Sequence, residues 1–323
     1  MISIESSDKP DSNWNTRLLN SETGTIFQTK ELACYHQQSL KWKPFFLKFI
    51  NQNGKIVGQI LIESRKRFEA KNNKNQLLKR IPGTKKEILT WNYGPVIFDK
   101  NYSTEIITKF RDYLIKQKSK IIGFEHPLSS GILSDFGKPF RIEPRATFLI
   151  DLSLGQEKIW QNMKKHSTRK NIERSQKKGV YTKLIDKNNL IDYYNLLRET
   201  KKKVGIDLSF SDTKIQWKKL SSVGFGGFLA YKDENPIGGL LVSFFNNYVN
   251  EWGVSRSEKD EREKLYSQDL IKWKIIDWGI SNKFRYYDLS GVNPKPQNEK
   301  ESGIFRYKEK FGGKFFRYYK IFM

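Results

Sequence analysis

The sequence Ile-Val-Gly-Gln-Ile-Leu-Ile at residues 56–62 decides the fold, because a similar stretch, Pro-Ile-Gly-Gly-Leu-Leu-Val, returns at residues 236–242. Each stretch is rich in apolar and β-branched residues and follows a turn signal, Asn53-Gly54 in the first case and residues 233–236 in the second. Apolar runs on both sides of such a turn predict an antiparallel hairpin. We expect strands at residues 45–50, 55–62, 227–231 and 237–245.

The likeness continues beyond the two hairpins. Residues 91–96 parallel residues 249–254, and we interpret both as strands that end on glycine. Apolar residues at helical spacing then predict a helix in each half, at 104–118 and at 263–278, and a short strand follows each helix, at 121–125 and at 285–289. This repeated order predicts a duplicated α/β unit with mixed sheets. We place the first domain at residues 1–148, joined by a C-terminal strand at 315–323, and the second at 149–314.

Two further helices are expected between the halves, at residues 157–178 and 188–203. The segment 64–87 is different, because it holds nine Lys or Arg against two Glu and little periodicity. We interpret it as a cationic surface loop. Residues 156–187 hold ten Lys or Arg against three acidic residues, which predicts either a phosphate or RNA track or a solvated helix face.

Composition limits the function classes. The chain has 323 residues and a formal net charge of +24, from 59 Lys and Arg against 35 Asp and Glu. This length predicts two domains, each large enough to bury its own core. The charge favours polyanionic partners such as RNA, phosphate-bearing carriers or an anionic membrane surface. A lysine-rich surface without a particular ligand is the alternative, and it stays open.

Cys34 is the only cysteine, which excludes an intrachain disulfide and any site with several cysteine ligands. His36, His126 and His166 show no metal-ligand spacing with it, so no metal is expected. Residues 1–15 do not have the pattern of a signal peptide, and no stretch reaches the ~20 apolar residues of a membrane span. We expect a cytoplasmic protein. Peripheral contact with the inner face of an anionic membrane stays open.

The C-terminal part of the sequence predicts a binding surface. Residues 286–291 read Tyr-Tyr-Asp-Leu-Ser-Gly, a strand that breaks on glycine. Residues 303–313 then form a compact run of aromatic and cationic residues that closes on a glycine pair. Carboxylates at the end of such a strand often cap a turn, and we therefore interpret Asp288 as structural rather than as a catalytic base.

This ending resembles the FemABX family, the non-ribosomal peptidyltransferases that move amino acids from aminoacyl-tRNA onto peptidoglycan precursors. Further matches to the family lie at residues 92–96, 147–153, 169–174 and 178–180, and at Thr200, Lys203 and Gly205. Members of the family are built from two GNAT-like domains, the acyl-CoA N-acyltransferase-like fold, and this architecture agrees with the duplication. No heptad segment long enough for the two-helix arm of the longer members exists here, so the chain resembles the armless members.

The resemblance implies a set of site residues. Lys308 and Tyr307 correspond to the catalytic positions: Lys308 would place positive charge near the developing oxyanion, and Tyr307 would form a wall of the substrate channel. A solvated surface lysine is the alternative for Lys308. The expected substrate-binding residues are His36, Arg169, Arg174, Lys203, Asn250, Trp252 and Arg306. Of these, His36 stands where the armless members have a lysine that holds the nucleotide diphosphate of the acceptor, and Asn250 and Trp252 replace a tyrosine pair.

The resemblance implies an aminoacyltransferase that moves an amino acid from aminoacyl-tRNA to a peptide amine of a peptidoglycan precursor. Its partners would be a charged tRNA, acting as co-substrate without a further cofactor, and a nucleotide- or lipid-linked peptide acceptor; we expect a monomer. A GNAT-like N-acyltransferase with an acyl-CoA donor is one alternative, although residues 255–260 lack the glycines of the coenzyme A signature. A non-catalytic RNA-binding protein is another, although no RNP, KH or zinc-knuckle pattern is present.

Overall fold

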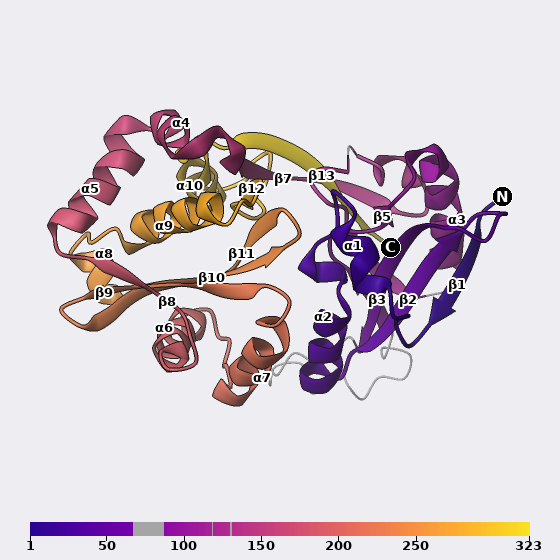
Figure 1. Cartoon of the computed structure of the whole chain (residues 1–323), viewed down its shortest axis with the longest axis horizontal. Coiled ribbons are helices and arrows are strands. Elements are labelled where there is room, and N and C mark those ends of the chain that lie inside the picture. Colours follow the sequence, from indigo (N-terminus) through magenta and orange to yellow (C-terminus); the bar gives the residue numbers. More distant parts are fainter. Residues whose placement is uncertain (67–86, 118, 130) are drawn as a thin grey trace. The chain divides into compact units, whose positions relative to one another are not determined.

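The computed structural model describes residues 1–66, 87–117, 119–129 and 131–323 (Figure 1). The chain divides into two compact units: unit 1 comprises Met1–Ala146 and Arg317–Met323, and unit 2 comprises Thr147–Phe316. Most of the cationic loop predicted at 64–87 lies outside the described residues. Its first three residues are the end of a strand rather than part of a loop.

Unit 1 contains a mixed sheet with the strand order β1-β2-β3-β4-β6-β13. The strands are β1 (Ser3–Ser7), β2 (Lys43–Ile50), β3 (Ile56–Lys66), β4 (Glu87–Trp91), β6 (Lys120–Phe124) and β13 (Lys314–Phe322), and the two-residue β5 (Val96–Ile97) pairs with β3. The predicted first hairpin is present as β2 and β3. β4 and β6 are parallel, and β13 returns to pair antiparallel with β6.

The long helix of unit 1 is α3 (Ser103–Lys116), which buries Ile106, Ile107, Phe110 and Leu114 as its sequence period predicts. The ring of Phe110 packs edge-to-face on Trp91 with centroids 5.1 Å apart. The shorter helical segments are α1 (Trp14–Leu19), η1 (Ile26–Gln28), α2 (Lys30–Tyr35), η2 (His36–Leu40), η5 (Lys100–Tyr102) and η6 (Ser134–Phe136).

In unit 2 the sheet has mixed strand directions and the order β7-β12-β11-β10-β9-β8. The strands are β7 (Arg141–Asp151, in this unit from Thr147), β8 (Tyr181–Leu184), β9 (Phe225–Lys232), β10 (Asn235–Phe245), β11 (Tyr248–Arg256) and β12 (Tyr286–Asp288). Only β11 and β12 are parallel, and just three residue pairs join them, from Tyr248 with Tyr286 to Asn250 with Asp288. Beyond Asn250, β11 continues without β12 beside it, so the two strands form an open fork.

Strand β11 also carries a β-bulge. In its pairing with β10, Gly253 lies opposite Leu241 and Glu251 lies opposite Val242, so Trp252 is the extra residue. A bulge redirects side chains and is common beside binding sites. The irregularity lies at the start of the open part of β11.

Helices cover both faces of this sheet (Figure 1). They are α4 (Gly155–Asn162), α5 (Lys170–Lys177), α6 (Leu190–Lys202), α7 (Phe210–Leu220), α8 (Glu258–Arg262), α9 (Ser267–Ser281) and α10 (Glu299–Glu309), with the short turns η7 (Leu152–Leu154) and η8 (Lys165–Arg169). A Cβ on Gly238 would lie 2.3 Å from Oγ of Ser267 in α9, and one on Gly239 would lie 2.9 Å from the ring of Tyr193 in α6. The glycine pair therefore lets a helix approach β10 from each side.

Three sequence predictions need correction. The helix expected at 157–178 is broken, because α4 ends at Asn162 and Met163 is extended before η8 and α5 begin. The helix expected from residue 263 begins at Ser267, whose backbone N–H donates to the carboxylate of Asp260. The predicted strands do not end on glycine either: β4 already ends at Trp91, and β11 continues through Gly253 to Arg256.

Candidate active site

Lys308 lies in α10, whose first turn is capped by the side chain of Asn298. Its Nζ donates to the backbone carbonyls of Ser290 and Gly291, at 3.0 and 3.2 Å. An ammonium group has three donors, and the described residues accept only these two bonds from it. One N–H of a half-buried, well-anchored cation is therefore left for another acceptor.

Charged neighbours act on Lys308 in opposite directions. Burial lowers the pKa of Lys308 below its usual value, Glu251 and Asp288 raise it again, and the nearby cation of Lys272 lowers it. Desolvation disfavours the charged form, whereas the two carboxylates stabilise it. The net effect is a lysine whose ammonium is a better proton donor than that of a solvated lysine.

The turn that anchors Lys308 is organised by Asp288. This fully buried carboxylate accepts hydrogen bonds from Tyr248 Oη at 2.6 Å, Asn250 Nδ2 at 2.9 Å and the backbone N–H of Ser290 at 2.8 Å, and also from the hydroxyl of Thr147. The bond to Ser290 is the turn cap predicted from the sequence. The side chain of Asn250, expected to bind substrate, points its amide at Asp288.

Tyr307 lies next to Lys308 and packs against two other side chains. Its ring lies edge-on to Phe311 with centroids 5.6 Å apart, and the Nζ of Lys310 lies 4.3 Å from the ring centroid. The phenol oxygen is buried and has no hydrogen-bond partner among the described residues. Burial raises the pKa of Tyr307 well above its usual value, so the group stays neutral and keeps its proton.

Two buried ion pairs lie around this part of unit 2. Lys272 pairs with Glu251, which also accepts from Tyr287 Oη at 2.8 Å. Lys310 pairs with Asp269, and burial raises the pKa of Asp269 while it lowers that of Lys310. Sequence reasoning missed these pairs. The available signal was the presence of charged residues within the apolar stretch that forms α9.

Arg169 and Arg174 lie in different surroundings. Arg169 ends η8, and its Nε is buried without a hydrogen-bond partner among the described residues. Arg174 is exposed on α5, together with Lys170 and Lys177, and the described residues offer no ion-pair partner to any of these three. Because they are spaced by four and three residues, they share one helix face, which we call the α5 cation face.

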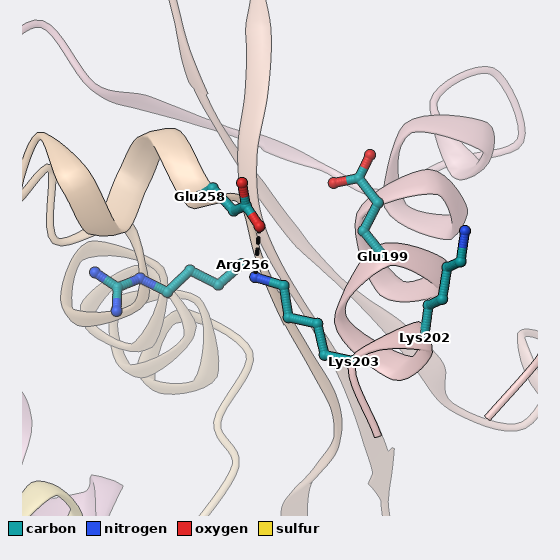
Figure 2. A pocket seen from close by; sticks show the side chains of 5 residues that line it. All are labelled: Glu199, Lys202, Lys203, Arg256 and Glu258. Atoms are coloured by element: carbon teal, nitrogen blue, oxygen red, sulfur yellow. Dashed lines mark ion pairs between the residues drawn. The ribbon is translucent and has the colours of Figure 1, made fainter. Parts of the chain in front are cut away.

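Lys203 lines an open cavity of about 440 Å³ with Glu199, Lys202, Arg256 and Glu258 (Figure 2). Its Nζ lies 3.1 Å from a carboxylate oxygen of Glu258. The side chain of Arg256 points away from α6, and its guanidinium pairs with Asp260. The cavity therefore holds charges of both signs.

The remaining predicted residues of unit 2 are not grouped around Lys308. Trp252, in the bulge, packs edge-on against Phe225 with centroids 5.2 Å apart. Arg306 is exposed on α10 and pairs with Glu299 at 2.5 Å. Their expected contacts with substrate stay predictions.

His36 lies in unit 1 and has a well-defined partner there. Its Nδ1 is 2.8 Å from a carboxylate oxygen of Glu63, and its ring lies 4.6 Å from that of Trp42 between centroids. Both His36 and Glu63 are largely buried. The side chain is thus held in place by its own unit, and its expected role with a diphosphate stays a prediction.

Among the described residues, none of the helices is both long and apolar enough to span a bilayer. The same residues contain no cluster of three metal-ligating side chains.

Comparisons with known proteins give one family match, over part of the chain. The model of the FemAB family matches residues 84–212, and the predicted resemblance to the FemABX family is confirmed over this range. No curated protein sequence matches the chain.

Solved structures show the same fold. The crystal structure of FemX is 12% identical with a TM-score of 0.70, and the match covers 98% of this chain and 96% of that one. L-PGS from Bacillus licheniformis is 13% identical with a TM-score of 0.56, covering 98% and 92%. A tandem GNAT protein from the clavulanic acid biosynthesis pathway is 8% identical with a TM-score of 0.56, covering 100% and 98%. The predicted α/β fold with GNAT-like domains is confirmed.

Proposed function

We propose, from the premise that residues 84–212 belong to the FemAB family, that this protein is an acyltransferase that uses aminoacyl-tRNA. It would move the amino acid to a peptide amine of a peptidoglycan precursor. The observation that carries the proposal is the state of Lys308, which is half-buried, anchored to two carbonyls and left with one N–H that no described residue accepts. Its position in α10 also matches the catalytic position that the family resemblance implies.

The chemistry needs little more than positioning and charge. The acceptor amine attacks the ester carbonyl, a C–N bond forms, and the tetrahedral intermediate carries negative charge on oxygen. The C–O bond to the tRNA ribose then breaks, and the proton lost by the amine ends on the ribose hydroxyl. The remaining N–H of Lys308 would donate to the oxyanion, and a preorganised donor of this kind contributes about 10²–10³-fold in rate. Tyr307, neutral and with an unused hydroxyl, would border the same space.

The proposed partners follow from the donor and from the charge of unit 2. A charged tRNA is the co-substrate, no further cofactor is required, and the protein acts as a monomer in the cytoplasm, where charged tRNA is found. The α5 cation face offers the RNA backbone three exposed cations that have no ion-pair partner among the described residues. His36, Arg169, Lys203, Asn250, Trp252 and Arg306 are proposed to contact donor or acceptor. The acceptor is a nucleotide- or lipid-linked peptide, and a lipid-linked one would bring the protein to the inner face of the membrane.

An acyl-CoA donor is the second candidate, and one contact in unit 2 argues against it. Coenzyme A carries a diphosphate, which favours the free N–H groups at a helix N-terminus. In α9 the first N–H already donates to the carboxylate of Asp260, at 2.9 Å, and Ser267 and Asp260 are fully buried. A negative charge therefore occupies the place that a diphosphate would need.

The test is a transfer assay with a pool of radiolabelled aminoacyl-tRNAs and a muropeptide precursor, with acetyl-coenzyme A in a parallel reaction. We expect label to appear in the precursor as a stable amide, and Lys308→Met to reduce this transfer at least about 10²-fold without a change in thermal unfolding. Lys300→Met is the matched control, because Lys300 is exposed on the same helix. Full turnover in Lys308→Met would reject the site. Transfer from acetyl-coenzyme A alone would support the second candidate, and tRNA binding without any transfer would support an RNA-binding protein.

A further inference from the structure

Two side chains from opposite ends of unit 2 in the sequence place a donor within hydrogen-bond reach of the backbone carbonyl of Ser290. Lys308 Nζ donates to it at 3.0 Å, and Thr147 Oγ1 lies 2.9 Å from it. The same residue donates its backbone N–H to Asp288 and its hydroxyl to the carbonyl of Glu251, at 2.8 and 2.9 Å. Every polar group of Ser290 is therefore used, and its carbonyl has a fixed direction.

The conformation of Ser290 indicates that this direction is imposed by its surroundings. Its φ is 64°, in the left-handed region that a residue with a side chain seldom adopts outside turns. Such a conformation is strained and persists only where the surrounding contacts determine it. Asp288 and Thr147 supply these contacts, and both are fully buried.

Thr147 links the two acceptors directly. Its hydroxyl has one proton, and both the carboxylate of Asp288 and the carbonyl of Ser290 lie within hydrogen-bond reach of its oxygen. Asp288 accepts from Tyr248, Asn250 and Ser290 whichever acceptor the Thr147 proton takes, so it is an anchor for the turn rather than a general base.

We propose that Thr147, Asp288 and Ser290 are positioning residues that hold the Lys308 ammonium in one orientation, with two N–H groups on the turn and the third directed at the reacting carbonyl. This inference rests on the proposed function for the role of Lys308. The hydrogen-bonded turn that holds the Lys308 ammonium is a property of unit 2 alone. Removal of the Thr147 hydroxyl frees the Ser290 carbonyl to rotate. The ammonium then loses part of its hydrogen bonding, becomes easier to deprotonate and no longer has a fixed third donor.

The first measurement follows Lys308 itself without any substrate. Trace acetylation of the whole protein over a range of pH, read by mass spectrometry of the peptide that contains Lys308, gives the pH at which its free amine appears. We expect Thr147→Val to move this midpoint down by about one pH unit, because a hydrogen bond to a charged group is worth about a tenfold change in equilibrium or more.

The control is Thr168→Val. Thr168 is also fully buried, and its Oγ1 donates to the backbone carbonyl of Lys310 at the same distance of 2.9 Å. This variant loses an equivalent bond near the end of α10 but leaves the Ser290 turn intact. We expect lower thermal stability in both variants and a shifted Lys308 midpoint only in Thr147→Val. Equal midpoints in wild type and Thr147→Val would overturn the proposal, and so would equal shifts in the two variants.

The second measurement is the transfer reaction. In Thr147→Val we expect kcat to fall about tenfold, KM for aminoacyl-tRNA to stay within about twofold, and the alkaline limb of the pH profile of kcat to move to lower pH. Failure of the proposed function would appear as absence of transfer in every variant, with the shift of the Lys308 midpoint still present. Failure of the positioning proposal would appear as transfer that Thr147→Val leaves unchanged.

Discussion

Lys308 differs from the other lysines of this chain through its contacts rather than through its type. Its neighbours in α10, Lys300 and Arg306, are exposed, whereas Lys308 is half-buried and bonds the backbone carbonyls of Ser290 and Gly291. The sequence could single out Lys308 and Tyr307 because the residues around them match a family. It could not predict the hydrogen bonds of the turn that holds Lys308. Thr147 and Ser290 are 143 positions apart in the sequence, and they meet only when β7 and β12 pair.

The buried ion pairs illustrate the same limit. Glu251 and Lys272 lie 21 positions apart, and Asp269 and Lys310 lie 41 apart, so no local pattern connects them. A charged residue in an apolar stretch indicates that a partner exists, because an unpaired buried charge is costly. The identity of the partner depends on the packing of α9 against β11 and on the position of the chain after α10.

Glu125 of unit 1 should make the free energy of unfolding depend on pH. It is fully buried, and desolvation raises the pKa of its carboxyl to about 7, although the backbone N–H groups of Leu133 and Tyr319 lower it in part. Between pH about 4.5 and 7 the folded chain holds a proton that the unfolded chain has released. The free energy of unfolding therefore falls as pH rises through this window, by up to about 3 kcal/mol from this group.

Substitution isolates this effect. Glu125→Gln should remove that dependence, as measured by urea unfolding of unit 1 at pH 5 and 7.5, while Glu22→Gln, an exposed residue of the same unit, should leave it unchanged. His126 acts in the opposite direction, because burial lowers its pKa to about 3 and its contribution is lost as pH falls from about 6.5. Because both proteins contain His126, its contribution to the free energy of unfolding cancels in the difference between wild type and Glu125→Gln. An identical pH slope in both proteins would contradict the prediction.

At the level of elements, the sequence predicted strands better than the ends of helices. Apolar, β-branched runs and turn residues predicted the two hairpins, and the structure extends their strands by a few residues. The break after α4 was not visible, because residues 155–178 contain neither proline nor an internal glycine. It depends on a tertiary contact: the backbone N–H of Lys164 donates to the carbonyl of Lys310 at 2.9 Å, and the hydroxyl of Thr168 donates to the same carbonyl.

We expect the α5 cation face to contribute to tRNA binding. Helix α5 buries Ile172 and Ser175, which leaves Lys170, Arg174 and Lys177 in solvent. Replacing these three by Gln should weaken tRNA binding about tenfold or more at 0.1 M salt and make the affinity less dependent on salt, because fewer counterions are released. Filter binding over a salt series measures both quantities.

The control for this prediction removes the same charge elsewhere in unit 2. Lys214, Lys218 and Lys219 lie on α7, and their replacement by Gln also lowers the net charge by three. If the tRNA contact lies on α5, only the α5 variant should change the salt slope. Equal losses in the two variants would instead indicate a nonspecific effect of net charge.

At the scale of the whole molecule, unit 1 is discontinuous. Its last strand comes from Arg317–Met323, and Lys320, Ile321 and Phe322 pair with Phe124, Gly123 and Ile122 of β6. From the sequence, we expect residues 315–323 to form a strand that joins the first domain. The structure places the return at Arg317 and the first boundary between Ala146 and Thr147.

Deletion of residues 317–323 should therefore destabilise unit 1 and leave unit 2 folded. The deletion removes the ladder to β6 and the fully buried Ile321, whose loss alone costs about 2–5 kcal/mol. Hydrogen exchange should show lost protection in β6 and α3 and retained protection in α9, which serves as the internal reference. Uniform loss of protection in both units would show that unit 2 depends on unit 1.

The return of β13 also has a consequence for biosynthesis. During translation, domains generally fold as units from the N-terminal one onward. Here all residues of unit 2 are synthesised before the strand that completes unit 1. Until then β6 presents an unpaired edge, which can pair with another nascent chain. The upstream unit thus has to wait in an incomplete form, which a chaperone would recognise, until the whole of the downstream unit has been made.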